Sequence, residues 1–209
     1  MPSPSDAPAR VLLATRSAGK LRELRPLFLA VGVEVIDLDT AGVRESATED
    51  NLESAATFEE NALAKARYFH RVTGEATIAD DSGLEVLALG GAPGVYSKRW
   101  SRGDLLGQAL DDANNALLLE RLGNGDDRRA RYVCAAAYCD AVRTHVERGE
   151  VLGRITRAAR GSGGFGYDPY FESEELGRTF GEVSAAEKAR VSHRARAFTK
   201  LLRRLMPQR

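Results

Sequence analysis

Two adjacent acidic residues, Asp80 and Asp81, follow a short apolar run and precede a Ser-Gly pair. Two neighbouring ionised carboxylates repel each other, and at the end of an apolar strand a hard cation offsets that repulsion most directly. A solvated turn is the alternative, because Asp, Ser and Gly are all common turn residues. The strand predicted over 77–80 therefore ends either at a cation site or in an ordinary turn, and these residues alone favour neither.

The segment 15–20, Thr-Arg-Ser-Ala-Gly-Lys, lies between a predicted strand and the start of a predicted helix. Backbone N–H groups and the helix dipole favour a phosphate at such a place, and Lys20 adds a positive charge. The segment is not a Walker A loop, because Leu21 stands where a Ser or Thr would bind magnesium. An ordinary capped turn with a solvated lysine is the alternative.

The segment 163–169, Gly-Gly-Phe-Gly-Tyr-Asp-Pro, combines a flexible backbone with two aromatic rings and an acid. A nucleobase can stack on such a ring while carboxylate and backbone groups bind its polar edge. A glycine-rich turn whose rings fill the core is the alternative. Lys188, His193 and Arg194 supply further donors, although such residues near a helix start are often structural or solvated.

A long acidic loop over 37–56 contains Glu53, and the helix after it contains Lys65. A carboxylate in a polar loop has no special role unless it meets a metal ion. Near Asp81, Glu53 would complete an oxygen-rich magnesium site, which needs only one or two protein carboxylates besides phosphate and water.

The bulk composition limits the class of protein. The chain has 209 residues, 43% of them hydrophobic, with thirty basic and thirty acidic residues. We expect a single domain over 10–209 after a disordered tail over 1–9, and the charge balance argues against a nucleic-acid polymer as partner. Without an apolar run near about eighteen residues we predict no membrane insertion, and without an apolar leader no secretion. Cys134 and Cys139 should be buried thiols, which suits a reducing cytoplasm.

Periodicity indicates which elements position these residues. A strand over 10–14, a helix containing Leu21 and Phe28, and a strand over 33–38 form a predicted βαβ unit. The later predictions are a helix capped at Thr57, a helix over 104–122 burying its leucines from Leu105 and Leu106 onward, a central strand over 131–139, strands over 142–146 and 151–155 with a turn at Gly149, and a final helix opening near Glu187. This order predicts a mixed sheet with helices packed on it.

Together these motifs resemble the inosine triphosphate pyrophosphatase family, enzymes that hydrolyse non-canonical purine nucleoside triphosphates. The similarity runs from about Val11 to Leu205. The segments that carry it are Leu13-Ala14-Thr15 with Lys20, Glu53 with 57–62 and Lys65, 79–84, 90–97, 164–169, and Glu187-Lys188 with Ser192-His193-Arg194.

The resemblance implies an α/β fold with a long central mixed β-sheet, helices packed at both ends, and two lobes flanking a nucleotide cleft. It implies Mg²⁺-dependent hydrolysis of ITP, dITP or XTP to the monophosphate and pyrophosphate. It also implies a homodimer.

The resemblance also assigns roles to residues. Asp81 would be the catalytic carboxylate and, with Glu53, a ligand of the metal that Asp80 supports. The phosphate-binding residues would be Thr15, Ser17, Lys20, Lys65 and Ser82. The residues around base and sugar would be Phe165, Gly166, Tyr167, Asp168, Lys188, His193 and Arg194. The family usually has Asn where Ser17 stands, and the shorter serine would reach phosphate through water.

Two other functions are compatible with the motifs. One is a related pyrophosphatase acting on modified pyrimidine nucleoside triphosphates. The other is a nucleotide sensor that binds without turnover, against which the presence of both Asp81 and Glu53 argues.

Overall fold

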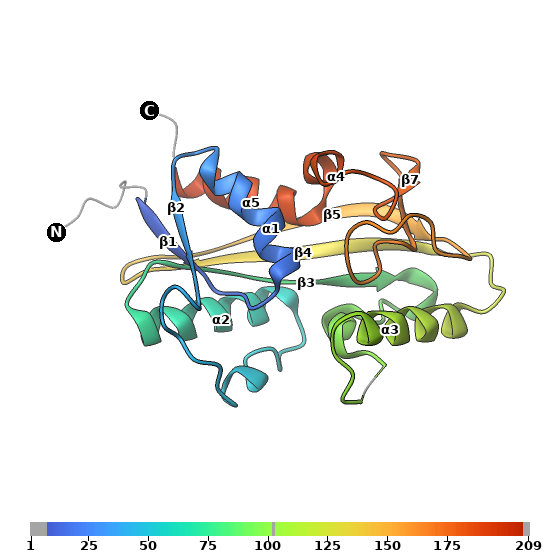
Figure 1. Ribbon diagram of the computed structural model, residues 1–209, viewed down its shortest axis with the longest axis horizontal. Coiled ribbons are helices and arrows are strands. Elements are labelled where there is room, and N and C mark those ends of the chain that lie inside the picture. Colours follow the sequence, from blue (N-terminus) through green and yellow to red (C-terminus); the bar gives the residue numbers. More distant parts are fainter. Residues whose placement is uncertain (1–7, 102, 207–209) are drawn as a thin grey trace. The chain divides into compact units, whose positions relative to one another are not determined.

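The computed structural model describes residues 8–101 and 103–206, so most of the predicted tail over 1–9 lies outside the described residues. Seven strands form one sheet in the order β2-β1-β3-β4-β5-β6-β7 (Figure 1). Its β1 pairs are parallel and its β6 pairs are antiparallel. The predicted mixed α/β fold is therefore confirmed, while the two lobes about a nucleotide cleft stay a prediction.

The predicted βαβ unit is present at the start of the chain. It consists of β1 (Arg10–Leu13), α1 (Ala18–Leu29) and β2 (Glu34–Asp37). The two strands are parallel, with Leu12 opposite Ile36. Ser17 caps α1 by accepting a hydrogen bond from the backbone of Lys20, so the loop predicted to bind phosphate is also the start of a helix.

The second helix, α2 (Phe58–Thr73), begins where the sequence predicts. The side chain of Thr57 accepts a hydrogen bond from the backbone N–H of Glu60, which satisfies one of the donors at the helix start. Phe58, Ala62 and Phe69 are buried, as the helical spacing requires.

The strand β3 (Thr77–Val86) is longer than the predicted one. It continues through Asp81 and the Ser-Gly pair, so the turn considered at this place is wrong. Eight of its ten residues are buried, and only Ser82 and Glu85 are partly exposed. Burial on both faces is what a central strand requires.

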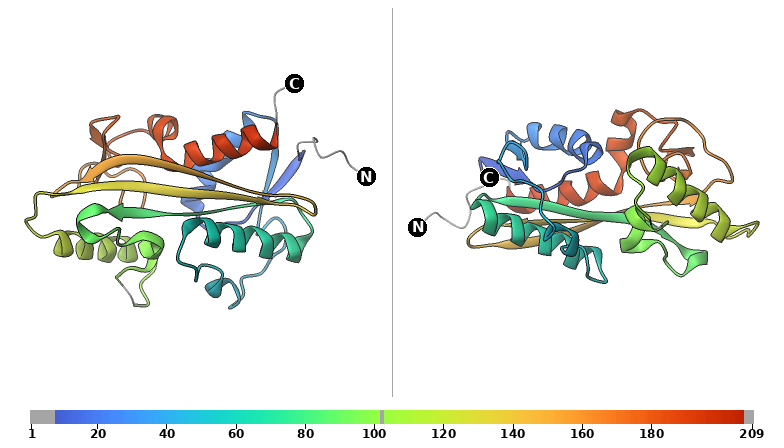
Figure 2. Two further views of the ribbon diagram at one scale, coloured as in Figure 1. Left: turned by 180° about the vertical axis from the view of Figure 1, so that it is seen from behind. Right: turned by 60° about the horizontal axis from the view of Figure 1, so that its bottom comes forward.

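The next two strands, β4 (Arg129–Cys139) and β5 (Thr144–Ile155), are long (Figure 2). The prediction of a turn at Gly149 is wrong, because β5 runs through that glycine. The turn instead follows β4, where Asp140 Oδ1 accepts hydrogen bonds from the backbone of Val142 and Arg143. Cys134 and Cys139 are buried free thiols, as predicted.

The remaining elements of the described chain are three short 3-10 helices, three α-helices and two short strands. They are η1 (Glu49–Asn51), η2 (Leu87–Leu89), η3 (Gly94–Arg99), α3 (Gly107–Leu122), β6 (Phe171–Ser173), β7 (Arg178–Thr179), α4 (Ala185–Val191) and α5 (His193–Leu205). The predicted final helix is thus two helices, separated at Ser192, whose backbone is extended.

The helix α3 corrects the predicted buried face. It starts at Gly107, which leaves Leu105 and Leu106 exposed before the helix. The side chains that α3 does bury are Leu118, Leu122 and two amides, Asn114 and Asn115.

The described chain divides into two compact units. The first contains the chain up to Asp81, Cys134–Gly149 and the chain from Arg194 on; the second contains Ser82–Val133 and Glu150–His193. In the first unit α1 and α5 cover one face of the sheet and α2 covers the other (Figures 1 and 2). A core joining α1, α5, β1, β3 and β4 includes Phe28, Tyr138 and Phe198.

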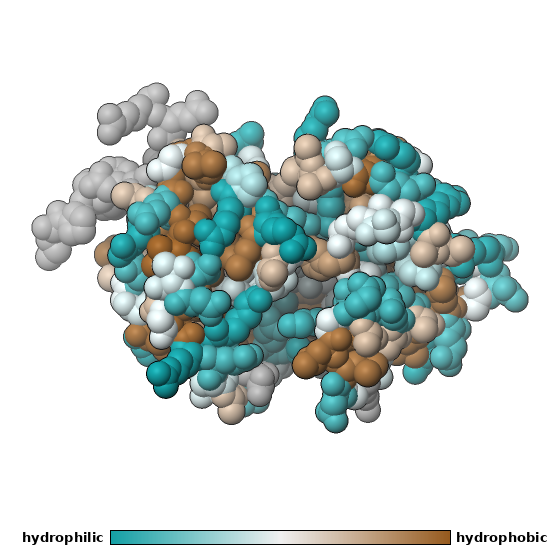
Figure 3. Space-filling view, viewed as in Figure 1, coloured by the Kyte–Doolittle hydropathy of each residue, from teal (hydrophilic) through white to brown (hydrophobic). Residues whose placement is uncertain are grey.

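The second unit has its own core, to which α3, β4, β5 and β6 contribute Leu118, Tyr132, Val151 and Phe171. Over residues 8–101 and 103–206, no helix is long and apolar enough to cross a membrane. On the face drawn in Figure 3, hydrophilic side chains are interspersed with apolar ones.

Candidate functional site

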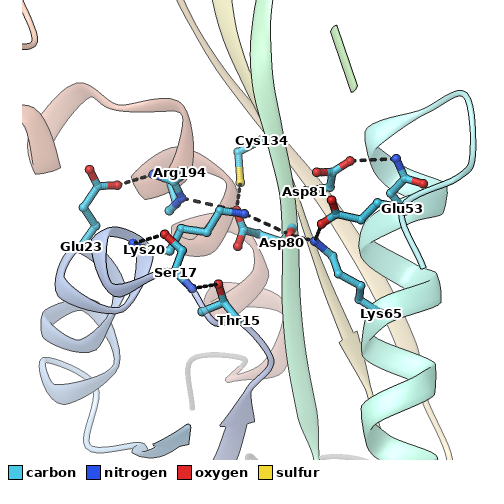
Figure 4. Close-up of polar contacts among 11 residues, drawn as sticks. Thr15, Ser17, Lys20, Glu23, Glu53, Lys65, Asp80, Asp81, Cys134 and Arg194 are labelled. Carbon is cyan, nitrogen blue, oxygen red and sulfur yellow. Dashed lines mark hydrogen bonds and ion pairs between the residues drawn. The ribbon is translucent and has the colours of Figure 1, made fainter. Parts of the chain in front are cut away.

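The side chains of Asp80 and Asp81 leave β3 on opposite sides because successive residues of a strand alternate between the faces of the sheet (Figure 4). Both carboxylates are buried, with exposed fractions of 1% for Asp80 and 6% for Asp81. The acidic pair therefore forms two separate sites on the two faces of the first unit.

On the face covered by α1 and α5, Asp80 is surrounded by cations. Its Oδ2 atom lies 3.0 Å from Lys20 Nζ and 3.4 Å from Arg194 Nε, and the Cys134 thiol lies 3.9 Å from the same oxygen. Arg194 also forms an ion pair with Glu23 on α1. Burial alone would lower the pKa of the Arg194 guanidinium, but Glu23 and Asp80 raise it, so this arginine stays charged in the interior.

On the face covered by α2, Asp81 is held by an amide. Asn61 Nδ2 donates to Asp81 Oδ2 over 2.9 Å, and Asn61 itself has no exposed surface. The same amide accepts a 2.9 Å hydrogen bond from the backbone N–H of Ala55. Asn61 therefore joins the carboxylate to the end of the acidic loop, two residues after Glu53.

Lys65 lies one helical turn after Asn61 and bridges two groups. Its Nζ forms an ion pair with Glu53 and donates to the backbone oxygen of Asp80 over 2.5 Å. Burial would lower the pKa of Lys65, but the negative charges of Glu53, Asp81 and Asp80 together raise it. The lysine is thus a buried cation.

The charged form of Asp81 is disfavoured despite that cation. Burial raises the pKa of its carboxyl group; Lys65 lowers it and Glu53 raises it further. Glu53 and Asp81 thus lie near enough to repel each other on one side of the strand. This pair fits magnesium, which takes one or two protein carboxylates and completes its shell with phosphate and water.

Of the three predicted metal residues, Asp80 does not join this pair. Its carboxylate lies on the other face with Lys20, which fits a supporting role and not coordination beside Asp81. In the part of the chain that the structure describes, no group of three His, Cys, Asp or Glu side chains is arranged to hold a metal. A magnesium ion held by Glu53 and Asp81 would take its other ligands from phosphate and water.

The loop predicted to bind phosphate is ordered by its own hydroxyl groups. Thr15 Oγ1 accepts from the backbone N–H of Ser17 over 3.2 Å, and Ser17 Oγ accepts from that of Lys20 over 3.3 Å. Lys20 lies within reach of both the carboxylate and the backbone oxygen of Asp80. Ser17 thus works as a helix cap, a role that Asn can also play.

Arg16, between those two hydroxyl residues, links this loop to the acidic loop. Its guanidinium group contacts both carboxylate oxygens of Glu49, over 2.9 and 2.8 Å, and donates to the backbone oxygen of Val43 over 3.1 Å. The hydrogen bond to Glu49 raises the pKa of Arg16. This pair could not be predicted from the sequence, because charged residues of polar loops usually face water.

In the second unit, the segment 163–168 is folded around a buried carboxylate. Asp168 Oδ2 accepts from the backbone N–H of Phe165 over 2.8 Å and from Lys188 Nζ over 2.6 Å. The Lys188 ammonium group also lies 5.0 Å from the centre of the Phe165 ring, in a cation–π arrangement. The ring of Phe165 is only partly buried, so it can still accept a stacked base.

The other residues predicted around the base have structural partners. Tyr167 is buried and its hydroxyl donates to the backbone oxygen of Ser97 over 2.8 Å. His193 stacks on Tyr132 with the ring centres 4.6 Å apart. Arg194 belongs to the group around Asp80 in the first unit, and Ser82 is a partly exposed residue of β3. Their roles towards a nucleotide stay predictions.

The chain is similar to known proteins over nearly its whole length. A sequence model of the Ham1 family matches residues 11–204. A protein of Mycolicibacterium paratuberculosis named dITP/XTP pyrophosphatase is 49% identical over 204 residues, covering 94% of this chain and 94% of that protein. One of the same name from Thermus thermophilus is 46% identical over 199 residues, covering 92% of this chain and 90% of that protein.

A solved structure gives the same result for the fold. The structure of a HAM1 protein from Coxiella burnetii superposes with a TM-score of 0.82 at 32% identity, covering 95% of this chain and 99% of that one. With a family match over nearly its whole length and relatives at this level of identity, the chain belongs to the Ham1 family.

Proposed function

We propose that the protein hydrolyses non-canonical purine nucleoside triphosphates such as ITP, dITP and XTP to the monophosphate and pyrophosphate, with Mg²⁺ as cofactor. The names of the relatives support the reaction and the substrate class. The observation that carries the proposal is the group on one face of β3, where Asn61 and Lys65 flank the buried carboxylate of Asp81.

Glu53 and Asp81 would hold the magnesium ion, which supplies positive charge against the triphosphate oxygens. Their mutual repulsion is the feature of the structure that such a cation would relieve. In the protein alone, the Lys65 ammonium group, which forms an ion pair with Glu53, offsets part of that repulsion.

In the proposed reaction, Asp81 orients a water molecule and accepts a proton from it. The water oxygen forms a new bond to the α-phosphorus while the bond from that phosphorus to the α–β bridging oxygen breaks, and pyrophosphate leaves. Asn61 holds one oxygen of the Asp81 carboxylate in a fixed direction, which is the positioning that such a step requires.

Lys65 and Lys20 would stabilise the negative charge that develops on the phosphate oxygens, the effect on which phosphoryl transfer mainly depends. Lys65 is held by Glu53 and the Asp80 backbone oxygen, and Lys20 by the Asp80 carboxylate. Both ammonium groups are thereby placed before a substrate arrives, so little reorganisation is needed.

Base selection would rest on Phe165 and the Lys188 ammonium group near it. A donor aimed at a 6-oxo group would pair with inosine or xanthosine and be left unpaired by the 6-amino group of adenosine. We also propose a homodimer, on the family resemblance. We propose a cytoplasmic location as well, because the two buried thiols are free and suit a reducing compartment.

The test is pyrophosphate release from ITP, XTP, dITP, ATP and GTP with magnesium. We expect the wild type to prefer the first three, and Asp81→Asn to lose activity by about a thousandfold, the usual scale for a general base. Asp126→Asn changes an exposed acid and serves as the matched control.

Near-full activity in Asp81→Asn would refute the assignment of the catalytic carboxylate. Faster turnover of UTP or dTTP analogues than of ITP would favour the pyrimidine alternative. Tight binding of ITP without pyrophosphate release by the wild type would indicate a sensor.

A further inference from the structure

Two side chains of α3 form hydrogen bonds with the backbone of a single residue of the glycine-rich segment. Asp111 and Asn115 are four residues apart, so they lie one turn from each other on the same face of the helix. Asp111 Oδ2 accepts from the backbone N–H of Gly166 over 2.8 Å, and Asn115 Nδ2 donates to the backbone oxygen of Gly166 over 3.0 Å. Neither side chain was singled out by its sequence pattern.

The two hydrogen bonds fix the backbone on both sides of Gly166. The N–H group belongs to the peptide shared with Phe165, and the oxygen belongs to the peptide shared with Tyr167. Each peptide is planar, so fixing one polar group of each sets its orientation. The direction in which the Phe165 ring projects therefore depends on α3.

The segment needs such a restraint because its conformation is unfavourable by itself. Gly166 has a φ of +62° with open space where a Cβ atom would be, so the glycine serves the backbone conformation and not close packing. Gly164, at φ +75°, has the Asp168 carboxylate where its Cβ would lie. A glycine-rich backbone loses much freedom on ordering, and hydrogen bonds from a helix offset that loss.

Asn115 also carries a cost that the fold alone does not explain. It is 5% exposed, and among the described residues its Oδ1 atom has no hydrogen-bond partner. A buried amide with an unsatisfied acceptor destabilises a protein relative to an apolar side chain. We therefore expect the role of Asn115 to lie in the contact of its Nδ2 atom with the Gly166 backbone oxygen.

From the other direction, Asp168 holds the backbone N–H of Phe165 and the Lys188 ammonium group near its ring. Phe165 is thus fixed on its N-terminal side by Asp168 and on its C-terminal side by α3. We propose that Asp111 and Asn115 are positioning residues for the nucleobase, which set the orientation of the Phe165 ring without touching the nucleotide. This inference rests on the proposed function, in which the base stacks on that ring.

The experiment compares binding of inosine monophosphate with binding of inorganic pyrophosphate by calorimetry, for the wild type, Asp111→Ala and Asn115→Asp. The second variant keeps the size of the side chain and places a carboxylate against the Gly166 oxygen. We expect inosine monophosphate affinity to fall by about tenfold in each, the scale of one hydrogen bond, with pyrophosphate affinity nearly unchanged. In turnover of ITP, KM should rise more than kcat falls.

The matched control is Asp112→Ala, which removes the neighbouring acid of α3. Asp112 is exposed, and its carboxylate accepts a hydrogen bond from Gln108 on the same helix. This variant should bind both ligands as the wild type does. Melting temperatures of all variants show whether they fold, and the isosteric Asp111→Asn replaces Asp111→Ala if that variant does not fold.

A double-mutant cycle with Phe165→Ala tests whether the two residues act through the ring. Once the ring is absent, Asp111→Ala should weaken inosine monophosphate binding no further. An additive loss would mean that Asp111 contacts the base itself and would overturn the inference, as would unchanged affinity in the single variants or an equal loss for both ligands. A wild type that neither binds inosine monophosphate nor hydrolyses ITP would refute the proposed function first, and this inference with it.

Discussion

Asn61 and Asp81 form a buried hydrogen bond at the candidate site. The amide Nδ2 lies 2.9 Å from one oxygen of the carboxylate, and the amide Oδ1 accepts from the backbone of Ala55 over 2.9 Å. One side chain thereby fixes the direction of Asp81 and the end of the loop that carries Glu53. The two carboxylates proposed to hold magnesium share this one positioning group.

Replacement of Asn61 by Ala should therefore damage both the reaction and metal binding. Partners that orient metal ligands typically contribute about 10- to 100-fold to affinity or activity, and we expect a loss of that size in kcat for ITP. Binding of Mn²⁺, followed by electron paramagnetic resonance, should weaken in the same variant. The exposed Asn124→Ala is the control, and unchanged Mn²⁺ binding in a folded Asn61→Ala would show that the contact is structural only.

Arg16 and Glu49 give a second prediction, because this pair joins the loop before α1 to the acidic loop. Arg16→Ala and Glu49→Gln should each raise the magnesium concentration needed for half-maximal activity several-fold, since Glu53 would be less restrained. Backbone amides over 44–56 should also exchange with deuterium faster.

Arg25→Ala is the matched control for this pair. It removes the ion pair between Arg25 and Asp37 at the other end of the same loop, and it should leave the magnesium requirement unchanged. Equal effects of Arg16→Ala and Arg25→Ala would mean that general loosening of the loop is responsible.

Periodic apolar patterns predicted the elements whose burial is one-sided and regular. The face of α2 from Phe58 to Phe69 and the βαβ unit are confirmed, because helical spacing and capping are local properties of the chain. The two strand boundaries that were wrong share one cause. A glycine near polar residues is typical of a turn, yet Gly83 and Gly149 lie inside β3 and β5, where pairing with neighbouring strands overrides the local preference.

The boundary of β3 also decided how much of the site could be predicted. Motifs identified Asp80 and Asp81, but only an uninterrupted strand places them on opposite faces of the sheet. Buried amides such as Asn61 and Asn115 were missed for a different reason. On a helix, their spacing resembles that of exposed polar residues, and their burial depends on loops distant in sequence.

Asp140, in the turn between β4 and β5, predicts a dependence of stability on pH. Burial acts to raise the pKa of its carboxyl group, but hydrogen bonds from Tyr138, Val142 and Arg143 outweigh it and lower the pKa to about 2. A folded-state pKa below the unfolded value of about 3.9 means that the stabilisation is complete above that pH and is lost as the pH falls towards about 2.

The measurement for Asp140 is the melting temperature of wild type and Asp140→Asn as a function of pH. The wild type should melt higher at neutral pH, and the difference should shrink between about pH 4 and pH 2. Asp126→Asn, at an exposed residue, is the control. A difference that does not depend on pH would contradict the ionic origin of this stabilisation.

The opposite faces of β3 predict opposite effects on stability for two chemically identical substitutions. Asp80→Asn removes the charge that Lys20 and Arg194 contact in the interior. Loss of one partner of a buried ion pair typically costs about 3–5 kcal/mol, although Glu23 would still pair with Arg194 and reduce that cost. We expect Asp80→Asn to melt well below the wild type, with activity reduced through the displaced Lys20.

Asp81→Asn should melt at or above the wild-type temperature when magnesium is absent. Burial and the charge of Glu53 both disfavour the ionised form of Asp81, so removing that charge relieves a cost in the free protein. The amide can still accept the hydrogen bond from Asn61. Melting curves and pyrophosphate release for the two variants, measured together, should separate a stable inactive protein from a destabilised one. If Asp81→Asn melts at a lower temperature than Asp80→Asn, the charge of Asp81 is compensated in the free protein. The repulsion between Asp81 and Glu53 then cannot be what favours a metal ion there.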